Sequence, residues 1–248
     1  MIIGVVWMLL FLSVMHFDLS HWQITLVWGL ISGFFSVSAN LLLIEAMTYQ
    51  EAGVCATIYR LNLVAVVIGA ILLLGETFSI IKLLGVFMAV VAVLFFARSK
   101  GGGTHSLSQR HLGLLLVLAA AVLRAGMGLS YKYAFLNGAD ANGITWINSF
   151  CWIGGGLVYT LWREPNAQIF TRKPWFYGIS SGLLLSGIVF FMAASLRYGD
   201  ASVVLPIAQM SFLGTAFLGT VMLKESLSGR KIMGIIAGLF CILLLCLC

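Results

Sequence analysis

Residues Tyr49–Gly85 read YQEAGVCATIYRLNLVAVVIGAILLLGETFSIIKLLG, and a related stretch recurs 149 residues later. The second copy, YGDASVVLPIAQMSFLGTAFLGTVMLKESLSGRKIMG, occupies Tyr198–Gly234. The alignment extends without a gap over 26–96 and 175–245, with 13 identities in 71 positions. Most identities are glycine, serine, glutamate, lysine or tyrosine at loops and helix contacts rather than scattered leucine and valine. We therefore interpret the chain as an internal repeat.

The composition around this repeat is that of a membrane protein. Of 248 residues, 61% are apolar and only 9% are charged, whereas soluble domains carry about 25% charged residues. So few charges cannot cover a soluble surface, which excludes an ordinary cytoplasmic enzyme, a secreted disulfide scaffold and a disordered chain. The apolar runs are about twice as long as the strands of a membrane barrel, which favours helices. We expect an all-α polytopic membrane protein with about nine transmembrane helices, at 1–15, 22–48, 52–74, 80–97, 111–136, 142–162, 175–197, 201–223 and 230–247.

The offset between the two copies spans five of these helices. Because five is odd, the copies must cross the membrane in opposite senses, the inverted-topology layout of secondary transporters. We expect a first repeat at 1–99 with four helices and a second at 111–248 with five, joined by a Gly/Ser-rich linker at 100–110. The counterpart of the helix at 111–136 would precede Met1. Either the first repeat lacks one helix, or the start of the chain is placed too late.

Both copies carry a pattern typical of a known family. The second copy reads ASLRYGDA at 194–201, LPIA at 205–208 and LKESLS at 223–228, followed by Gly234; the first reads EAMTY at 45–49 and LGETFS at 74–79, followed by Gly85, with Thr57 in place of the proline. In these residues the chain resembles two tandem EamA-like domains of the drug/metabolite transporter superfamily. The resemblance implies ten helices and export or uptake of small metabolites or drugs without ATP. It implies nothing about which solute is carried.

A few charges lie inside the predicted spans rather than in loops: Arg60, Arg124, Lys132 and Glu45. A charge at the bilayer centre costs at least about 2.5–3.5 kcal/mol on insertion scales, so it usually faces a partner or a wet cavity. Under the repeat, Arg60 corresponds to Gln209. The pseudo-two-fold axis would place these two residues at matched depth on opposite sides of a central cavity.

We expect the substrate site around these charges. Thr57 and Pro206 are also equivalent under the repeat, and a proline can free a backbone carbonyl for binding. The candidate substrate-binding residues are Arg60, Thr57, Tyr59, Arg124, Gln209 and Pro206, with Glu45 as a charge partner. Two guanidiniums against one acid favour a carboxylate-bearing substrate. The alternative left open is that Arg60 forms a structural bridge with Glu45 and that Arg124 reaches the interface or backbone carbonyls.

Positive charge in the loops bears on partners and orientation. The net charge is +6, but most basic residues lie between spans, where they act as topology signals and lipid contacts rather than as a nucleic-acid stripe. The loops after 80–97, 142–162 and 201–223 hold nine basic residues against two on the opposite side. This bias puts Met1 inside and the C-terminus outside. The ten-helix family pattern implies the reverse, and both orientations stay open.

We expect a secondary transporter in the cell inner membrane that moves a small amino-acid-like or other carboxylate-bearing metabolite by alternating access. The alternatives are an exporter of cationic drugs and a non-transporting scaffold or lipid-carrier-handling subunit. No Ser-His-Asp, phosphate-loop or dinucleotide motif appears, so no enzyme activity is expected. The histidines and cysteines lack metal-ligand spacing, and we expect neither a metal nor a cofactor. The expected partners are the solute and the lipid bilayer, with a homodimer left open.

Overall fold

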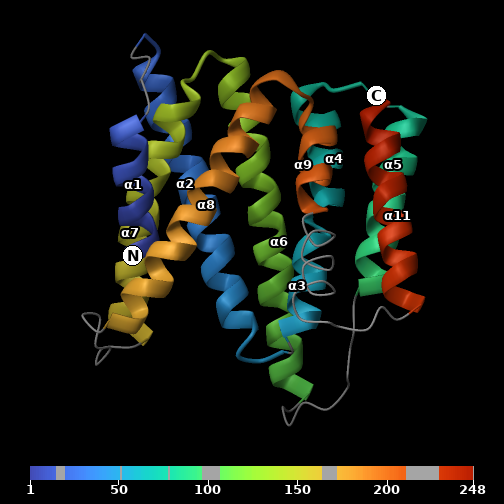
Figure 1. The fold of residues 1–248 in the computed structure, drawn as a ribbon, viewed down its shortest axis with the longest axis horizontal. Helices are drawn as coiled ribbons and strands as arrows, with labels where there is room; N and C mark the ends of the chain where they lie inside the picture. The colour runs from blue at the N-terminus through green and yellow to red at the C-terminus, as the bar shows by residue number, and fades with distance from the viewer. Residues whose placement is uncertain are drawn as a thin grey trace. The chain divides into compact units, whose positions relative to one another are not determined.

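A computed structural model describes residues 1–14, 20–50, 52–77, 79–96, 107–163, 172–210 and 229–247. Within these ranges the regular elements are α-helices, which Figure 1 shows as a ribbon. They are α1 (Ile2–Val14), α2 (Trp22–Ala46), α3 (Ala52–Arg60), α4 (Asn62–Leu74), α5 (Ile80–Phe96), α6 (Leu107–Leu136), α7 (Ala141–Arg163), α8 (Arg172–Tyr198), α9 (Ala201–Gln209) and α11 (Gly229–Cys246). The predicted all-α fold is therefore confirmed. The part of the predicted span 201–223 that follows Met210 lies outside the described residues.

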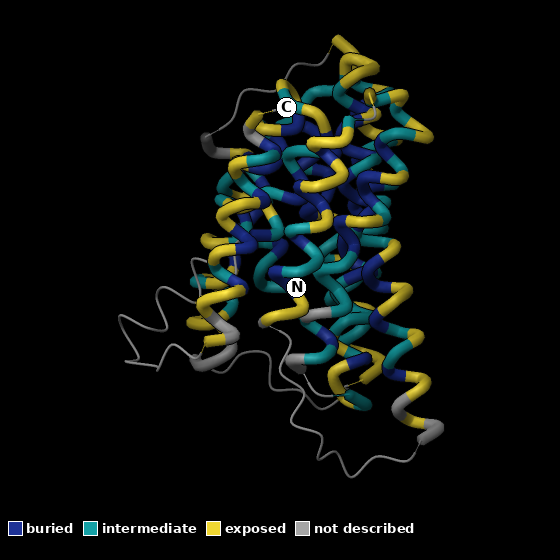
Figure 2. Tube along the Cα trace, turned by 90° about the vertical axis from the view of Figure 1, so that its right-hand side faces the viewer, coloured by how far each residue is buried: buried dark blue, intermediate teal, exposed yellow. Residues whose placement is uncertain are grey.

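Helix length and surface composition agree with a membrane environment. In the described part of the chain, four segments are long and apolar enough to cross a bilayer: Trp22–Ala46, Val54–Leu74, His111–Leu136 and Trp175–Tyr198. Large apolar side chains are exposed on them; Leu72 is 75% exposed and Phe191 is 70% exposed. Figure 2 shows that exposed residues recur along the length of the helices. Such a surface is unfavourable in water but suits lipid, so the chain is a polytopic membrane protein.

The chain divides into two compact units, and each takes segments from both sequence repeats. Unit 1 consists of Met1–Leu41 and Gly126–Tyr198, and unit 2 consists of Leu42–Ala125 and Gly199–Cys248. The compact units therefore do not follow the order of the repeats along the chain. Helix α6 begins at Leu107, so the end of the predicted linker is already helical.

Unit 1 is packed through small residues that bring helices close together. Helix α1 contacts both α7 and α8. On α8, a Cβ at Gly178 would lie 2.6 Å from Cγ2 of Ile2, and one at Gly182 would lie 2.9 Å from Cβ of Val6. Two glycines four residues apart thus form the surface against which α1 packs, the small-xxx-small arrangement of membrane helices.

Gly155 and Gly154 on α7 provide a matched test of this packing. A Cβ at Gly155 would lie 2.6 Å from Cγ1 of Val37 on α2, whereas one at Gly154 would meet nothing within 4 Å. We expect Gly155→Ala to destabilise the protein by about 1–3 kcal/mol through overpacking. Gly154→Ala should be neutral or slightly stabilising, because alanine loses less backbone entropy in a helix. Thermal unfolding in detergent measures both; equal midpoints would contradict the packing of α2 on α7.

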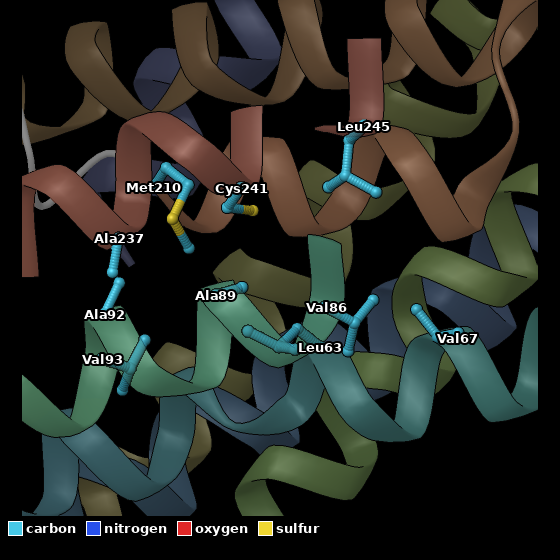
Figure 3. Packing of buried hydrophobic residues seen from close by; sticks show 10 residues of the cluster. All are labelled: Leu63, Val67, Val86, Ala89, Ala92, Val93, Met210, Ala237, Cys241 and Leu245. Atoms are coloured by element: carbon cyan, nitrogen blue, oxygen red, sulfur yellow. The ribbon is translucent and has the colours of Figure 1, made fainter. Parts of the chain in front are cut away.

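Unit 2 contains an antiparallel helix pair that the inverted repeat predicts. Helices α5 and α11 are equivalent under the 149-residue offset, and they lie side by side (Figure 1). A Cβ at Gly85, near the start of α5, would lie 2.8 Å from Leu245, near the end of α11. The two helices therefore run in opposite directions. Figure 3 shows the buried cluster between these and neighbouring helices: Leu63, Val67, Val86, Ala89, Ala92, Val93, Met210, Ala237, Cys241 and Leu245.

Candidate functional site

In unit 2 the repeat makes two positions equivalent: a break between α3 and α4, and the end of α9. Helices α3 and α4 belong to one apolar span, Val54–Leu74, with a break at Leu61. There the N–H of Leu61 donates to the carbonyl of Ile58 at 3.0 Å. At the end of α9 the N–H of Met210 donates to the carbonyl of Ile207 at 2.9 Å, and both residues lie 149 positions after their counterparts. A tight turn with three-residue spacing inside a membrane helix often marks a functional hinge.

Arg60, the last residue of α3, meets Gln209, the last residue of α9. The last carbonyls of a helix have no partner within it, and Nη1 of Arg60 donates to the Gln209 carbonyl at the end of α9, at 2.7 Å. Nε2 of Gln209 in turn donates to Oδ1 of Asn62, the first residue of α4, at 3.2 Å. Arg60 and Gln209 are equivalent under the repeat.

Tyr59 and Arg124 lie in the same unit as this contact. The hydroxyl of Tyr59 is buried and has no hydrogen-bond partner among the described residues. Arg124, which projects from α6, is close enough to interact with that hydroxyl electrostatically. Around them Tyr59 packs against a buried cluster of Ala46, Cys55 and Val117. The described part of unit 2 therefore brings Tyr59 together with Arg124, as it brings Arg60 together with Gln209.

Three candidate residues predicted from the sequence remain: Thr57, Pro206 and Glu45. Thr57 belongs to α3, but its side chain lies outside the described residues. Pro206 is buried inside α9. A proline gives no N–H to the carbonyl four residues earlier, which here belongs to Ser202, whereas the carbonyl that Arg60 contacts belongs to Gln209. Glu45 lies in the last turn of α2, where its backbone carbonyl accepts a hydrogen bond from the Thr48 hydroxyl at 2.7 Å.

Glu76 contacts the start of a helix that is not its neighbour in the sequence. A carboxylate just before the helix at 80–97 suits the N-terminus of that helix, but the structure places Glu76 at α9 instead. Its carboxylate accepts hydrogen bonds from the N–H of Ala201 at 2.6 Å, from the N–H of Ser202 at 3.0 Å and from the Ser202 hydroxyl. The physical reason is the turn after α4, where Gly75 has φ of 67° and ends the helix. Glu76 thus caps a helix from the other repeat.

An ion pair with one buried and one exposed partner lies next to this cap. Nζ of Lys82 on α5 is 2.7 Å from Oδ2 of Asp200, the residue just before α9. The Lys82 side chain is 6% exposed and the Asp200 side chain is 47% exposed. Lys82 lies near the start of the predicted span 80–97, a position typical of an interfacial charge, but the structure buries its side chain. The sequence gives one indication of a partner for Lys82: both copies carry an acidic residue at the same position, Glu51 in the first and Asp200 in the second.

Comparison with known proteins gives one family and one fold. A model of the EamA-like transporter family matches residues 111–247. The comparison with curated proteins found no match. A solved structure titled only "Crystal structure of protein" is similar to the chain with a TM-score of 0.76 and 16% identity, over 98% of this chain and 83% of that one. At this identity the likeness shows the fold alone.

Proposed function

The chain belongs to the EamA-like transporter family, whose members move small solutes across membranes, and we propose that its solute is a small metabolite bearing a carboxylate, such as an amino-acid-like compound. The observation that supports this proposal is the guanidinium of Arg60 at the end of α3, 2.7 Å from the Gln209 carbonyl. The negative end of the α9 dipole stabilises this positive charge within the apolar span. A guanidinium has five N–H donors, so it can bridge a backbone carbonyl and a solute carboxylate.

The surroundings of Arg60 support an anionic group rather than a cationic one. Arg124 brings a second positive charge to the neighbourhood of Tyr59. A cationic drug would meet repulsion from both guanidiniums, and removing its hydration shell would cost further free energy. We therefore favour the carboxylate-bearing solute over the exporter of cationic compounds.

The proposed mechanism is alternating access in the cell inner membrane. In inverted-repeat transporters, discontinuous helices meet near the bilayer midplane, and the repeats exchange conformations around the bound solute. The turn at Leu61 has a described helix on each side, and the end of α9 at Met210 is its counterpart under the repeat. We propose that Leu61 acts as a hinge, since a three-residue turn bends more readily than the regular α-helix on either side.

Flux into liposomes that contain the purified protein tests this function. Amino acids and dicarboxylates are compared with matched amines and amides that lack the carboxylate. We expect exchange of carboxylate-bearing solutes and little exchange of the matched compounds. Exchange restricted to amines would support the cationic exporter instead, and no exchange under any imposed gradient would support a scaffold; either result rejects the proposal.

A further inference from the structure

Asn62 carries a buried amide whose oxygen has a hydrogen-bond partner and whose nitrogen has none among the described residues. It is 2% exposed and follows directly after the break between α3 and α4. Its Oδ1 accepts the hydrogen bond from Gln209, which fixes the direction of the amide group. Its Nδ2 is buried and has no hydrogen-bond partner among the described residues. A buried donor of this kind is unfavourable unless an acceptor meets it.

A second buried donor lies three residues earlier on the same span. The Tyr59 hydroxyl also has no hydrogen-bond partner within the described ranges. Tyr59 and Asn62 flank the break on the same apolar span, and Arg60 lies between them in sequence. A phenol O–H, a guanidinium and an amide N–H are thus contributed by three of the four consecutive residues 59–62 at the break. Such a set of donors suits a ligand rich in acceptor oxygens.

A comparison inside the same chain shows what a purely structural asparagine does. Asn148 on α7 is also fully buried. Its Oδ1 accepts a hydrogen bond from the Ser32 hydroxyl at 3.1 Å, and its Nδ2 donates to the Tyr131 hydroxyl. Both sides of that amide are used in packing unit 1. Asn62 differs because its donor side has no such partner in the described part of the chain.

We propose that Asn62 determines solute specificity: with its Oδ1 held by Gln209, its Nδ2 donates a hydrogen bond to a carboxylate oxygen of the carried solute. This inference rests on the proposed function, because it assigns a further contact within the same site. It explains why the span carries a polar residue that appears in none of the recognised motifs. It also predicts that a negative side chain at position 62 disfavours a carboxylate solute relative to its matched amide.

The test is the ratio of carboxylate flux to amide flux in liposomes, for a carboxylate solute that the wild-type protein carries and its matched amide. Asn62→Asp keeps an acceptor for Gln209 but replaces the donor by a negative group. We expect the ratio to fall at least tenfold, since a hydrogen bond to a charged group is lost. Asn148→Asp is the matched control, and it should lower the thermal midpoint without changing the ratio.

The outcomes separate this inference from the proposed function. If the wild-type protein carries no carboxylate solute, the proposed function fails and the inference fails with it. If the wild type carries one and Asn62→Asp leaves the ratio unchanged, only the role of Asn62 is overturned. Should Asn62→Asp not fold, Asn62→Ser replaces it, with an expected rise of about tenfold in KM for the carboxylate solute. An unchanged KM would then reject the inference.

Discussion

Replacing Arg60 by glutamine is expected to reduce carboxylate flux about a hundredfold, with the protein still inserted in the membrane. Charge-assisted hydrogen bonds contribute about 1.5–3 kcal/mol each, and each 1.4 kcal/mol is a tenfold change. Loss of a two-pronged contact to a carboxylate therefore accounts for roughly two orders of magnitude. Glutamine also lacks the reach to donate to the Gln209 carbonyl, the contact that Arg60 makes at 2.7 Å.

Two further variants make the Arg60 prediction specific. Arg60→Lys keeps the charge but not the planar fork, so we expect an intermediate flux with a raised KM. Arg197→Gln is the matched control, because Arg197 is exposed at the end of α8, with its guanidinium 6.0 Å from the ring centre of Tyr198. Its flux should equal that of the wild type. Unchanged flux in a folded Arg60→Gln protein would show that Arg60 only stabilises the end of α9.

The internal repeat is the feature of the sequence that predicts the relative direction of helices. It predicts opposite directions for α5 and α11, and the contact of Gly85 with the far end of α11 confirms this. It also relates Arg60 to Gln209, but the expected position on opposite sides of a central cavity differs from the structure, in which Nη1 of Arg60 contacts the Gln209 carbonyl. The prediction of helix direction succeeds because an internal symmetry constrains three-dimensional positions, whereas composition indicates only that a segment is apolar.

Contacts between the repeats could not be predicted in the same way. The target of Glu76 is the N-terminus of α9, 125 residues away in sequence, and helix-cap patterns identify only the neighbouring helix. Asn62 belongs to no motif, and its repeat counterpart is Ser211. The role proposed for Asn62 depends on its buried amide, whose Oδ1 has a hydrogen-bond partner and whose Nδ2 has none among the described residues. That information exists only once the helices are packed.

Replacing Glu76 by glutamine is expected to have the largest effect on stability. The Glu76 carboxylate accepts two backbone N–H groups and one hydroxyl at the start of α9. A glutamine amide would turn one acceptor into a donor facing a donor, and it would remove the charge that favours a helix N-terminus. We expect a loss of about 3 kcal/mol in unfolding free energy. For a protein of this size that is roughly a 6–12 °C fall in thermal midpoint.

The hydrogen bonds at this cap predict losses of unfolding free energy that differ between single variants and do not add in the double variant, as measured by unfolding in detergent. Ser202→Ala removes only the hydroxyl contact to Glu76 and should cost about 1 kcal/mol. Ser195→Ala is the control, because the Ser195 hydroxyl bonds to Phe191 within its own helix, and it should be close to neutral. The double variant Glu76→Gln/Ser202→Ala should cost less than the sum of its parts, since both changes remove the same contact. Strict additivity, or a Glu76→Gln midpoint equal to the wild type, would show that the carboxylate does not hold α9 to the end of α4.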